Sequence, residues 1–388
     1  MWISLSGSYL FAIKHGKLEV VETAIVGFLL FGLPLVVFPI GVTQFEIPKV
    51  FLAELAIFLL LLLKLLKLKK ITWDWLSWLP VRLIGLIIGL SLIHLLFFST
   101  QTTLFGNIFR LQGIFPLWLL LILALTSREI KLTIIPANLP LVVLIAVAGS
   151  VILFGTNSAG RAVGFLGEPN ALAATAIFLW PWIYFQQPTT FTWKKVLACV
   201  CVIFVLILSG SRSGVIAFVI QLTLLVLMKR FTLAKSALVA LGLFGLSLFL
   251  PLWERNLVFE NRAEVWMTAW WAGWKNPILG NGFGNIESAL RASAISLTNN
   301  LRFQYVDSSH NLLLDWWVQG GIIGVGLLLS LIFISFRKFI DHKKPLELVL
   351  ILGLLTVMQF NPVSVVTLVG FWWLLGQGFK RDTPEVSS

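Results

Sequence analysis

The chain has 388 residues, of which 58% are hydrophobic and 12% are charged, and its mean hydropathy is +0.95. In a soluble domain about a quarter of the residues are charged, so this composition excludes an ordinary soluble globular protein. The formal net charge is +12, which raises the question of whether the basic residues serve a polyanionic partner or the membrane.

Runs of apolar residues long enough to cross a bilayer recur along the whole chain. Lipid offers no hydrogen bonds to the backbone, so a spanning segment must be a helix or part of a closed barrel. These runs are too continuous for the alternating pattern of barrel strands. We therefore predict an all-α, polytopic integral membrane protein, with residues 1–388 forming a single transmembrane domain. The twelve predicted spans are roughly 21–43, 50–67, 79–98, 108–126, 134–154, 170–186, 194–209, 214–228, 234–253, 311–336, 346–361 and 364–379.

The only long polar insertion covers residues 254–310, and one short amphipathic helix is predicted inside it. Asn261 is suited to cap that helix, and Pro277 ends it. Arg262, Trp266, Trp270 and Trp274 recur every four residues and share one helical face. A face rich in tryptophan is typical of a helix at the membrane–water interface. Glycines 280, 282 and 284 follow as a flexible loop.

The distribution of basic residues predicts the orientation of the chain. With both termini in the cytoplasm, twenty of the 29 lysines and arginines fall on the cytoplasmic side, as expected for a protein of the cytoplasmic membrane. The net charge then reflects topology and attraction to anionic membrane lipids, and it gives no indication of nucleic-acid binding. The nine basic residues on the outer side are Lys49, Arg110, Arg161, Arg212, Arg255, Arg262, Lys275, Arg291 and Arg302.

Seven of these nine outer residues are arginines, whose planar fork binds phosphate oxygens in a bidentate way. They could instead reach lipid headgroups or pair with neighbouring glutamates. As a set they favour an outward-facing polyanion site. Arg212 lies in "LSGSRSGVIA", where two short spans meet. That connection is either a re-entrant turn lining a wet cavity or a tight hairpin.

His310 lies at the outer start of a long span, followed by Asn311 and, one turn later, Asp315. A histidine near phosphates can act as a base or as a charged donor. Asp315 is unusual at that depth and could bind either the loop or the histidine. Both cysteines, Cys199 and Cys201, fall in one span at positions that cannot form a disulfide with each other.

Several segments in this order resemble the superfamily of O-antigen ligases and O-antigen polymerases. They are "LFGNIFRLQGIF" at 104–115, "GRAVGFLGEPNALAA" at 160–174, "SGSRSG" at 209–214, "NRAEVWMTAWWAGWKNPILGNGFG" at 261–284 and "SSHNLLLDWWVQGGIIG" at 308–324. The resemblance covers roughly residues 100–335. It implies a donor glycan carried on undecaprenyl diphosphate at the outer leaflet, with Arg212 and Arg262 holding the diphosphate and His310 serving the acceptor or leaving group. Relatives carry a glutamate nine residues after the histidine, where this chain has Gln319.

The chain contains no Asp-x-Asp pair to hold a metal ion, so arginines are expected to stabilise the leaving diphosphate in a metal-independent and cofactor-independent transfer. The expected catalytic residues are His310, Arg212 and Arg262. The expected substrate-binding residues are Arg110, Arg161, Asn311, Arg291, Arg302 and Asp315.

The acceptor is a lipid, a glycan or a protein. The arginine, tryptophan, proline and glycine motif followed by "HN" resembles the ligase-related domain, so a membrane glycosyltransferase of the ligase type is expected, and a polymerase that joins lipid-linked repeat units is the alternative. A transporter of lipid-linked glycans and a non-enzymatic membrane scaffold are the alternatives outside the enzyme class. Transporters tend to show internal repeats and polar or broken helices at mid-membrane, whereas here the distinctive polar residues gather at the outer ends of spans.

Overall fold

The computed structural model describes residues 18–38, 44–67, 78–107, 110, 112–130, 132, 135–186, 192–248, 262–303 and 306–379. Within these ranges the chain is all-helical, and its only β-type pairing is the isolated bridge between Thr156 and Ala162. The predicted fold class, an all-α polytopic membrane protein, is confirmed.

The first helix runs over Leu18–Leu35 and ends in a π turn and a 3-10 turn. The others are α2 (Glu46–Lys67), α3 (Leu79–Phe97), α4 (Ile114–Ser127), α5 (Leu139–Phe154), α6 (Pro169–Gln186), α7 (Trp193–Ser209), α8 (Arg212–Leu227), α9 (Leu233–Ser247), α10 (Arg262–Lys275), α11 (Ile286–Ser296), α12 (Leu312–Asp341), α13 (Pro345–Met358) and α14 (Val365–Gly378). Each of the twelve predicted spans coincides with one of these helices. Parts of four predicted spans lie outside the described ranges, namely residues 39–43, 108, 109, 111, 134 and 249–253.

Three described helices are long and apolar enough to cross a membrane by length and composition: the first helix, α3 and α12. Six further apolar helices are shorter, at 10–17 residues. Several helices at the outside of the bundle keep apolar side chains exposed, such as Leu86 of α3 and Phe333 of α12. Such faces suit contact with lipid, because in a bilayer the outside of a bundle is as apolar as its core.

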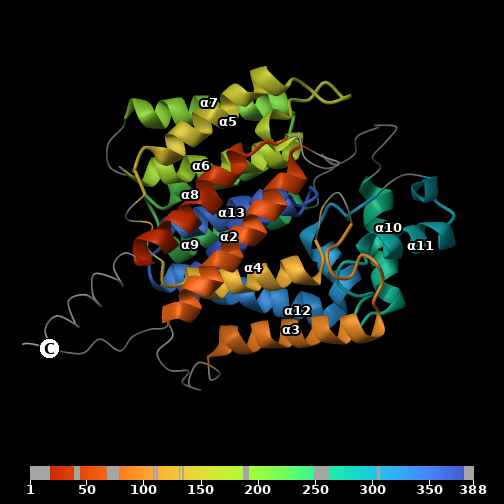
Figure 1. Ribbon diagram of the computed structural model, residues 1–388. Coiled ribbons are helices and arrows are strands. Elements are labelled where there is room, and N and C mark those ends of the chain that lie inside the picture. The colour runs from red at the N-terminus through yellow and green to blue at the C-terminus, as the bar shows by residue number, and fades with distance from the viewer. Residues whose placement is uncertain are drawn as a thin grey trace, which may run out of the picture.

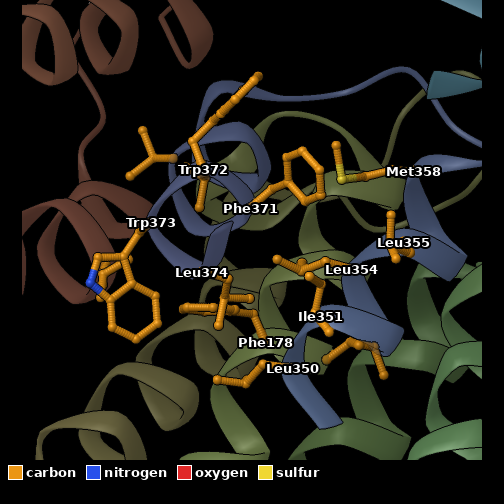
Figure 2. Close-up of a cluster of buried hydrophobic side chains, with 14 of the residues drawn as sticks. Phe178, Leu350, Ile351, Leu354, Leu355, Met358, Phe371, Trp372, Trp373 and Leu374 are labelled. Carbon is orange, nitrogen blue, oxygen red and sulfur yellow. The ribbon is translucent and has the colours of Figure 1, made fainter. Parts of the chain in front are cut away.

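The centre of the bundle is formed by α13 and α14, whose residues are almost all buried. α13 packs against α6 and α8, while α14 packs against α4 and α12. Figure 2 shows Phe178 of α6 near Leu350 and Ile351 of α13 and Leu374 of α14. A helix that is apolar on all sides is buried on all sides, which is why these two helices occupy the middle.

The polar insertion at residues 254–310, predicted to be a large extracytoplasmic loop, holds two described α-helices, α10 and α11, where one was predicted. They lie together at one end of the bundle, with α10 running across the direction of α3 and α12 (Figure 1). The sequence of α11, "IESALRASAIS", has few large apolar residues, and its buried side rests on Leu290 and Ala294. Ile286, Ala289, Leu290 and Ala294 nevertheless recur at helical spacing and pack inward, so the sequence did contain a signal for this helix.

α12 is kinked at Gly321, whose φ of 59° and ψ of −159° are not helical. The kink leaves the carbonyl groups of Val318 and Gln319 without helical partners, and they accept hydrogen bonds from the backbone N–H groups of Asn281 (2.8 Å) and Gly282 (3.0 Å). The N–H of Ile322 donates to the carbonyl of Pro277 at 2.8 Å. The loop after α10 is thereby fixed against the middle of α12.

Candidate active site

The connection between α7 and α8 is a tight turn that places Arg212 at the first position of α8. Gly210 ends α7 in the left-handed conformation, and the Ser211 side chain caps α8 by accepting a hydrogen bond from the N–H of Gly214 at 3.3 Å. A cation at a helix N-terminus opposes the helix dipole, but the two together create a strongly positive site. Arg212 is exposed there.

The turn between α13 and α14 reaches the α8 terminus through Asn361. The amide nitrogen of Asn361 donates to the hydroxyl of Ser213, directly after Arg212, and to the carbonyl of Val357 at 3.0 Å. Asn361 and Ser213 are both buried. The start of α8 is therefore held against a turn that follows it by almost 150 residues in the sequence.

Arg262 is the first residue of α10 and is half-buried. One turn further on, the ring of Trp266 lies 6.1 Å from the ring of Phe360, in the same α13–α14 turn. Trp270 stacks on Trp317 of α12 at 5.7 Å, and its carbonyl accepts a hydrogen bond from the Trp317 indole at 3.0 Å. The predicted tryptophan face therefore packs on α12, although Trp270 and Trp274 remain 48% and 50% exposed.

His310 lies immediately before α12, and its φ of 59° places it in the left-handed region. The next residue, Asn311, caps α12 by accepting a hydrogen bond from the N–H of Leu314 at 3.0 Å. The Asn311 amide also donates to the carbonyl of Gln359 at 3.0 Å. His310 is thus adjacent to a residue bound to the same α13–α14 turn.

The structure therefore brings the neighbourhoods of the three expected catalytic residues to one place. Residues 359–361 contact Ser213 beside Arg212, Trp266 one turn from Arg262, and Asn311 beside His310. Two of the expected catalytic residues begin a helix, and the third precedes one, so three helix N-termini surround this turn. The dipoles of these helices add positive potential to that of the side chains.

The other expected substrate-binding arginines lie elsewhere or are engaged. Arg110 donates to Asp307 (2.7 Å) and Glu168 (3.3 Å). Burial on its own lowers the pKa of the Arg110 guanidinium, but the two carboxylates outweigh burial and raise this pKa above its ordinary value. Arg161 donates to the carbonyl of Ser209 at 2.7 Å and to the Asn170 side chain at 2.8 Å, which ties the loop before α6 to the end of α7.

Arg291 and Arg302 are exposed on and after α11, and Arg255 lies outside the described residues. Lys49 is fully buried, and its ammonium group donates to the carbonyls of Phe45 (3.0 Å) and Phe165 (2.8 Å). Of the outer cations, Arg212 and Arg262 are the two whose neighbourhoods meet at the α13–α14 turn together with that of His310.

A cavity of about 100 Å³ lies beside this region. Its walls come mainly from apolar side chains of α2, α4, α12 and α14, and its polar lining residues are Glu54, Arg110, Gln112, Asp315 and Gln319. Sequence reasoning missed Glu54 and Gln112. The signal for Glu54 was available, because an acid inside an apolar span is a functional candidate in its own right.

Asp315 is buried, and its carboxylate accepts hydrogen bonds from Ser308 and Ser309. Of the two partners that the sequence left open, loop groups are therefore the ones the structure shows. Gln319 lies one turn further on; its side-chain oxygen accepts from the N–H of Gly284 at 2.9 Å, and its nitrogen donates to the carbonyl of Asp315 at 3.2 Å. A neutral amide suits this pair of partners, because it is a donor and an acceptor at once.

His94 of α3 is the other outer histidine, and it has a structural setting. It is fully buried, with one ring nitrogen 2.8 Å from the carbonyl of Leu279 and the other accepting from the N–H of Phe283 at 3.2 Å. These partners fix a neutral tautomer. His94 therefore holds the glycine loop to α3.

Residues 197–329 match a family model described as O-antigen ligase. Over that stretch, about a third of its length, the chain is similar to the O-antigen ligase family. The O-antigen ligase match includes α8, α10, α11 and the kinked first half of α12, and therefore Arg212, Arg262 and His310. No curated protein matches the chain.

Parts of the site lie outside the O-antigen ligase match. The α13–α14 turn, on which the three helix starts converge, follows it, and Arg110 and Arg161 precede it. Among the described residues no group of three histidine, cysteine, aspartate or glutamate side chains could hold a metal ion. The functional groups that the structure places near the α13–α14 turn include two arginines, a histidine and three helix N-termini.

Proposed function

We propose that this O-antigen ligase-like protein transfers a glycan from undecaprenyl diphosphate to an acceptor hydroxyl, on the outer side of the cytoplasmic membrane. The observation that carries the proposal is the convergence of three helix starts, bearing Arg212, Arg262 and His310, on the α13–α14 turn. Fixed cations and helix N-termini are the groups that bind phosphate. The family match supports a lipid-linked glycan as the substrate class.

In the proposed reaction the bond between the anomeric carbon and the diphosphate oxygen breaks as the acceptor oxygen bonds to that carbon. Negative charge grows on the leaving diphosphate, where Arg212, Arg262 and the helix N-termini stabilise it. His310 takes the proton of the acceptor hydroxyl. A single displacement of this kind inverts the anomeric centre. The apolar lining of the neighbouring cavity suits hydrocarbon rather than a charged head group.

The test is transfer with purified protein. Wild type, His310→Ala, Arg212→Ala and Arg262→Ala are supplied with undecaprenyl diphosphate glycan and a panel of lipid, glycan and protein acceptors. Arg337→Ala, at the far end of α12 and 72% exposed, is the matched control. We expect wild type and the control to release undecaprenyl diphosphate and form product, and the three site variants to fold but fail.

The outcomes separate the candidate functions. A lipid-linked repeat unit as the productive acceptor would identify a polymerase, which uses the same donor and the same leaving group. Site variants that match wild type would show that the active site lies elsewhere. If wild type transfers nothing to any acceptor, the enzyme proposal fails, and movement of the intact lipid-linked glycan across vesicles is measured next.

A further inference from the structure

We infer that Asp315 is a positioning residue that fixes the backbone of His310 through Ser308 and Ser309. The inference rests on the proposed function in one respect, which is that His310 is the group being positioned for catalysis. Asp315 is 8% exposed and lies in the first turn of α12, directly after the segment that carries His310.

The three hydrogen-bond donors that the described residues offer to the Asp315 carboxylate belong to the two residues before His310. One oxygen accepts from the N–H of Ser309 at 2.7 Å and from the Ser309 hydroxyl at 2.5 Å. The other oxygen accepts from the Ser308 hydroxyl at 3.0 Å. Hydrogen bonds to an ionised acceptor are roughly twice as strong as neutral ones, so this is a firm attachment.

Ser308 passes this constraint on to His310. Because the single hydroxyl hydrogen of Ser308 is committed to Asp315, its oxygen is left as an acceptor, and the N–H of His310 donates to it at 3.0 Å. A continuous chain of hydrogen bonds therefore links the Asp315 carboxylate, the Ser308 hydroxyl and the backbone of His310.

The backbone of His310 needs such support. Among the described residues only Thr298, His310 and Lys343 combine a side chain with a positive φ. A residue held in this region persists only where its surroundings impose the conformation, and such residues cluster at functional sites. A different φ at residue 310 would turn the imidazole away from its present direction while leaving Asn311 in place as the cap of α12.

A carboxylate fits this arrangement, and an amide of the same size does not. All three partners of Asp315 are donors, and an ionised carboxylate accepts at both oxygens. In Asp315→Asn the NH₂ group faces either the Ser309 N–H, donor against donor, or the Ser308 hydroxyl, which must then turn its hydrogen elsewhere. In either orientation the hydrogen bonds from one of the two serines to residue 315 are disrupted, while the volume of the side chain is unchanged.

The first test observes His310 directly. The chain has four histidines, so protein carrying ¹³C-labelled histidine gives few enough ring signals to assign by His310→Ala. We expect Asp315→Asn and Ser308→Ala to shift or broaden the His310 signal and to leave the buried His94 signal unchanged. Asp341→Asn, at the far end of α12, is the control and should move neither signal. A His310 signal that is unchanged in both site variants overturns the inference.

The second test measures kinetics. We expect Asp315→Asn and Ser308→Ala to lower kcat by about ten- to a hundredfold, the scale of a misplaced catalytic group, while KM for the donor stays within about twofold. Ser308→Thr keeps the hydroxyl and should retain kcat. A purely structural role would instead lower thermal stability and raise KM together.

Failure of the proposed function and failure of the positioning role of Asp315 give different results. If wild type transfers no glycan, the proposed function fails, and the histidine signals still decide whether Asp315 controls the conformation of His310. If wild type transfers glycan and both variants keep the wild-type kcat, the proposed function stands and the positioning role of Asp315 is wrong.

Discussion

At the scale of single residues, the role of an outer arginine depends on what already neutralises it. Arg110 lies on the cavity wall as an anion-binding residue would, yet Asp307 and Glu168 both pair with it. Arg212 and Arg262 differ in that each begins a helix, where the backbone adds positive potential to the side chain. In our proposal Arg110 is a structural clamp, and Arg212 and Arg262 bind the diphosphate.

Arg110→Ala is therefore expected to affect stability. The substitution leaves the carboxylates of Asp307 and Glu168, which are 13% and 29% exposed, without their shared cation. Loss of one partner of a buried ion pair costs about 3–5 kcal/mol, and we expect the lower half of that range because both acids retain some contact with water. Thermal unfolding in detergent measures the change.

The control for Arg110 is Arg291→Ala, which removes an exposed arginine of the same outer side and should leave the unfolding temperature unchanged. If Arg110→Ala unfolds at the wild-type temperature but no longer binds the donor, Arg110 is a substrate ligand, as the sequence suggested.

The same arginines carry a prediction about metal ions. With Arg212 and Arg262 stabilising the leaving diphosphate, transfer should proceed at the wild-type rate in EDTA, and added Mg²⁺ or Mn²⁺ should not increase it. The measurement is release of undecaprenyl diphosphate with and without chelator, and dialysis of the protein against EDTA serves as the control for tightly held metal. Abolition of activity by EDTA and its recovery with either ion would contradict the arginine mechanism.

At the scale of elements, α12 is built around an interruption. The kink at Gly321 releases two carbonyls and an N–H that bind the loop after α10, and Gln319 and His94 hold the same loop from either side. The helix that begins beside His310 is thus coupled to the helix that begins at Arg262. The two halves of the proposed site keep their relative positions through this loop.

Gly321→Ala should disrupt that coupling. A Cβ atom at residue 321 would lie 2.5 Å from the carbonyl oxygen of Ile278, and the φ of 59° is unfavourable for alanine. We expect a loss of at least about 2 kcal/mol in the free energy of unfolding, from strain and from hydrogen bonds broken with the loop. Thermal unfolding and transfer activity should both fall.

The matched control is Gly326→Ala, one and a half turns further along α12, where an added Cβ meets nothing within 4 Å. There alanine should stabilise the protein by about 0.5–1 kcal/mol, because glycine is the poorer helix former. Equal effects at the two positions would mean that the kink is not required.

At the scale of the whole molecule, the sequence was sufficient to predict features that depend on neighbouring residues in the chain. Long apolar runs predict the helices because a bilayer imposes their length, and all twelve predicted spans coincide with helices. Interior packing instead joins residues that are far apart in the sequence. The α13–α14 turn gave no signal, since Gln359 and Asn361 are ordinary polar residues until the fold places Asn311 and Ser213 against them.

The ion pairs of Arg110 follow the same rule. Asp307 follows Arg110 by almost 200 residues, and Glu168 lies in a third segment. The motif around Arg110 predicts a polar outer loop. Only the tertiary fold brings Asp307 and Glu168 to Arg110, where they neutralise its charge. The kink in α12 was likewise hidden, because a glycine pair inside an apolar helix is common in membrane proteins without a break.

The orientation of the molecule is the remaining whole-chain prediction. The bias of lysine and arginine places both termini and the α8–α9 connection in the cytoplasm, and it places α11 outside. Phe231, 53% exposed in that connection, and Ile295, 57% exposed on α11, are suitable reporters because replacing either leaves the charge bias intact. In a background with Cys199→Ala and Cys201→Ala, each is replaced by cysteine, and intact cells are treated with a membrane-impermeant maleimide.

We expect Ile295→Cys to react in intact cells and Phe231→Cys to react only after the membrane is opened. The expectation follows from α8 itself, because Arg212 begins this helix and Phe231 follows its end, so the helix separates the proposed outer site from the basic connection. The reverse labelling would place Arg212 in the cytoplasm, where a donor held at the outer leaflet cannot reach it. Labelling of both cysteines in intact cells would mean that α8 does not cross the membrane.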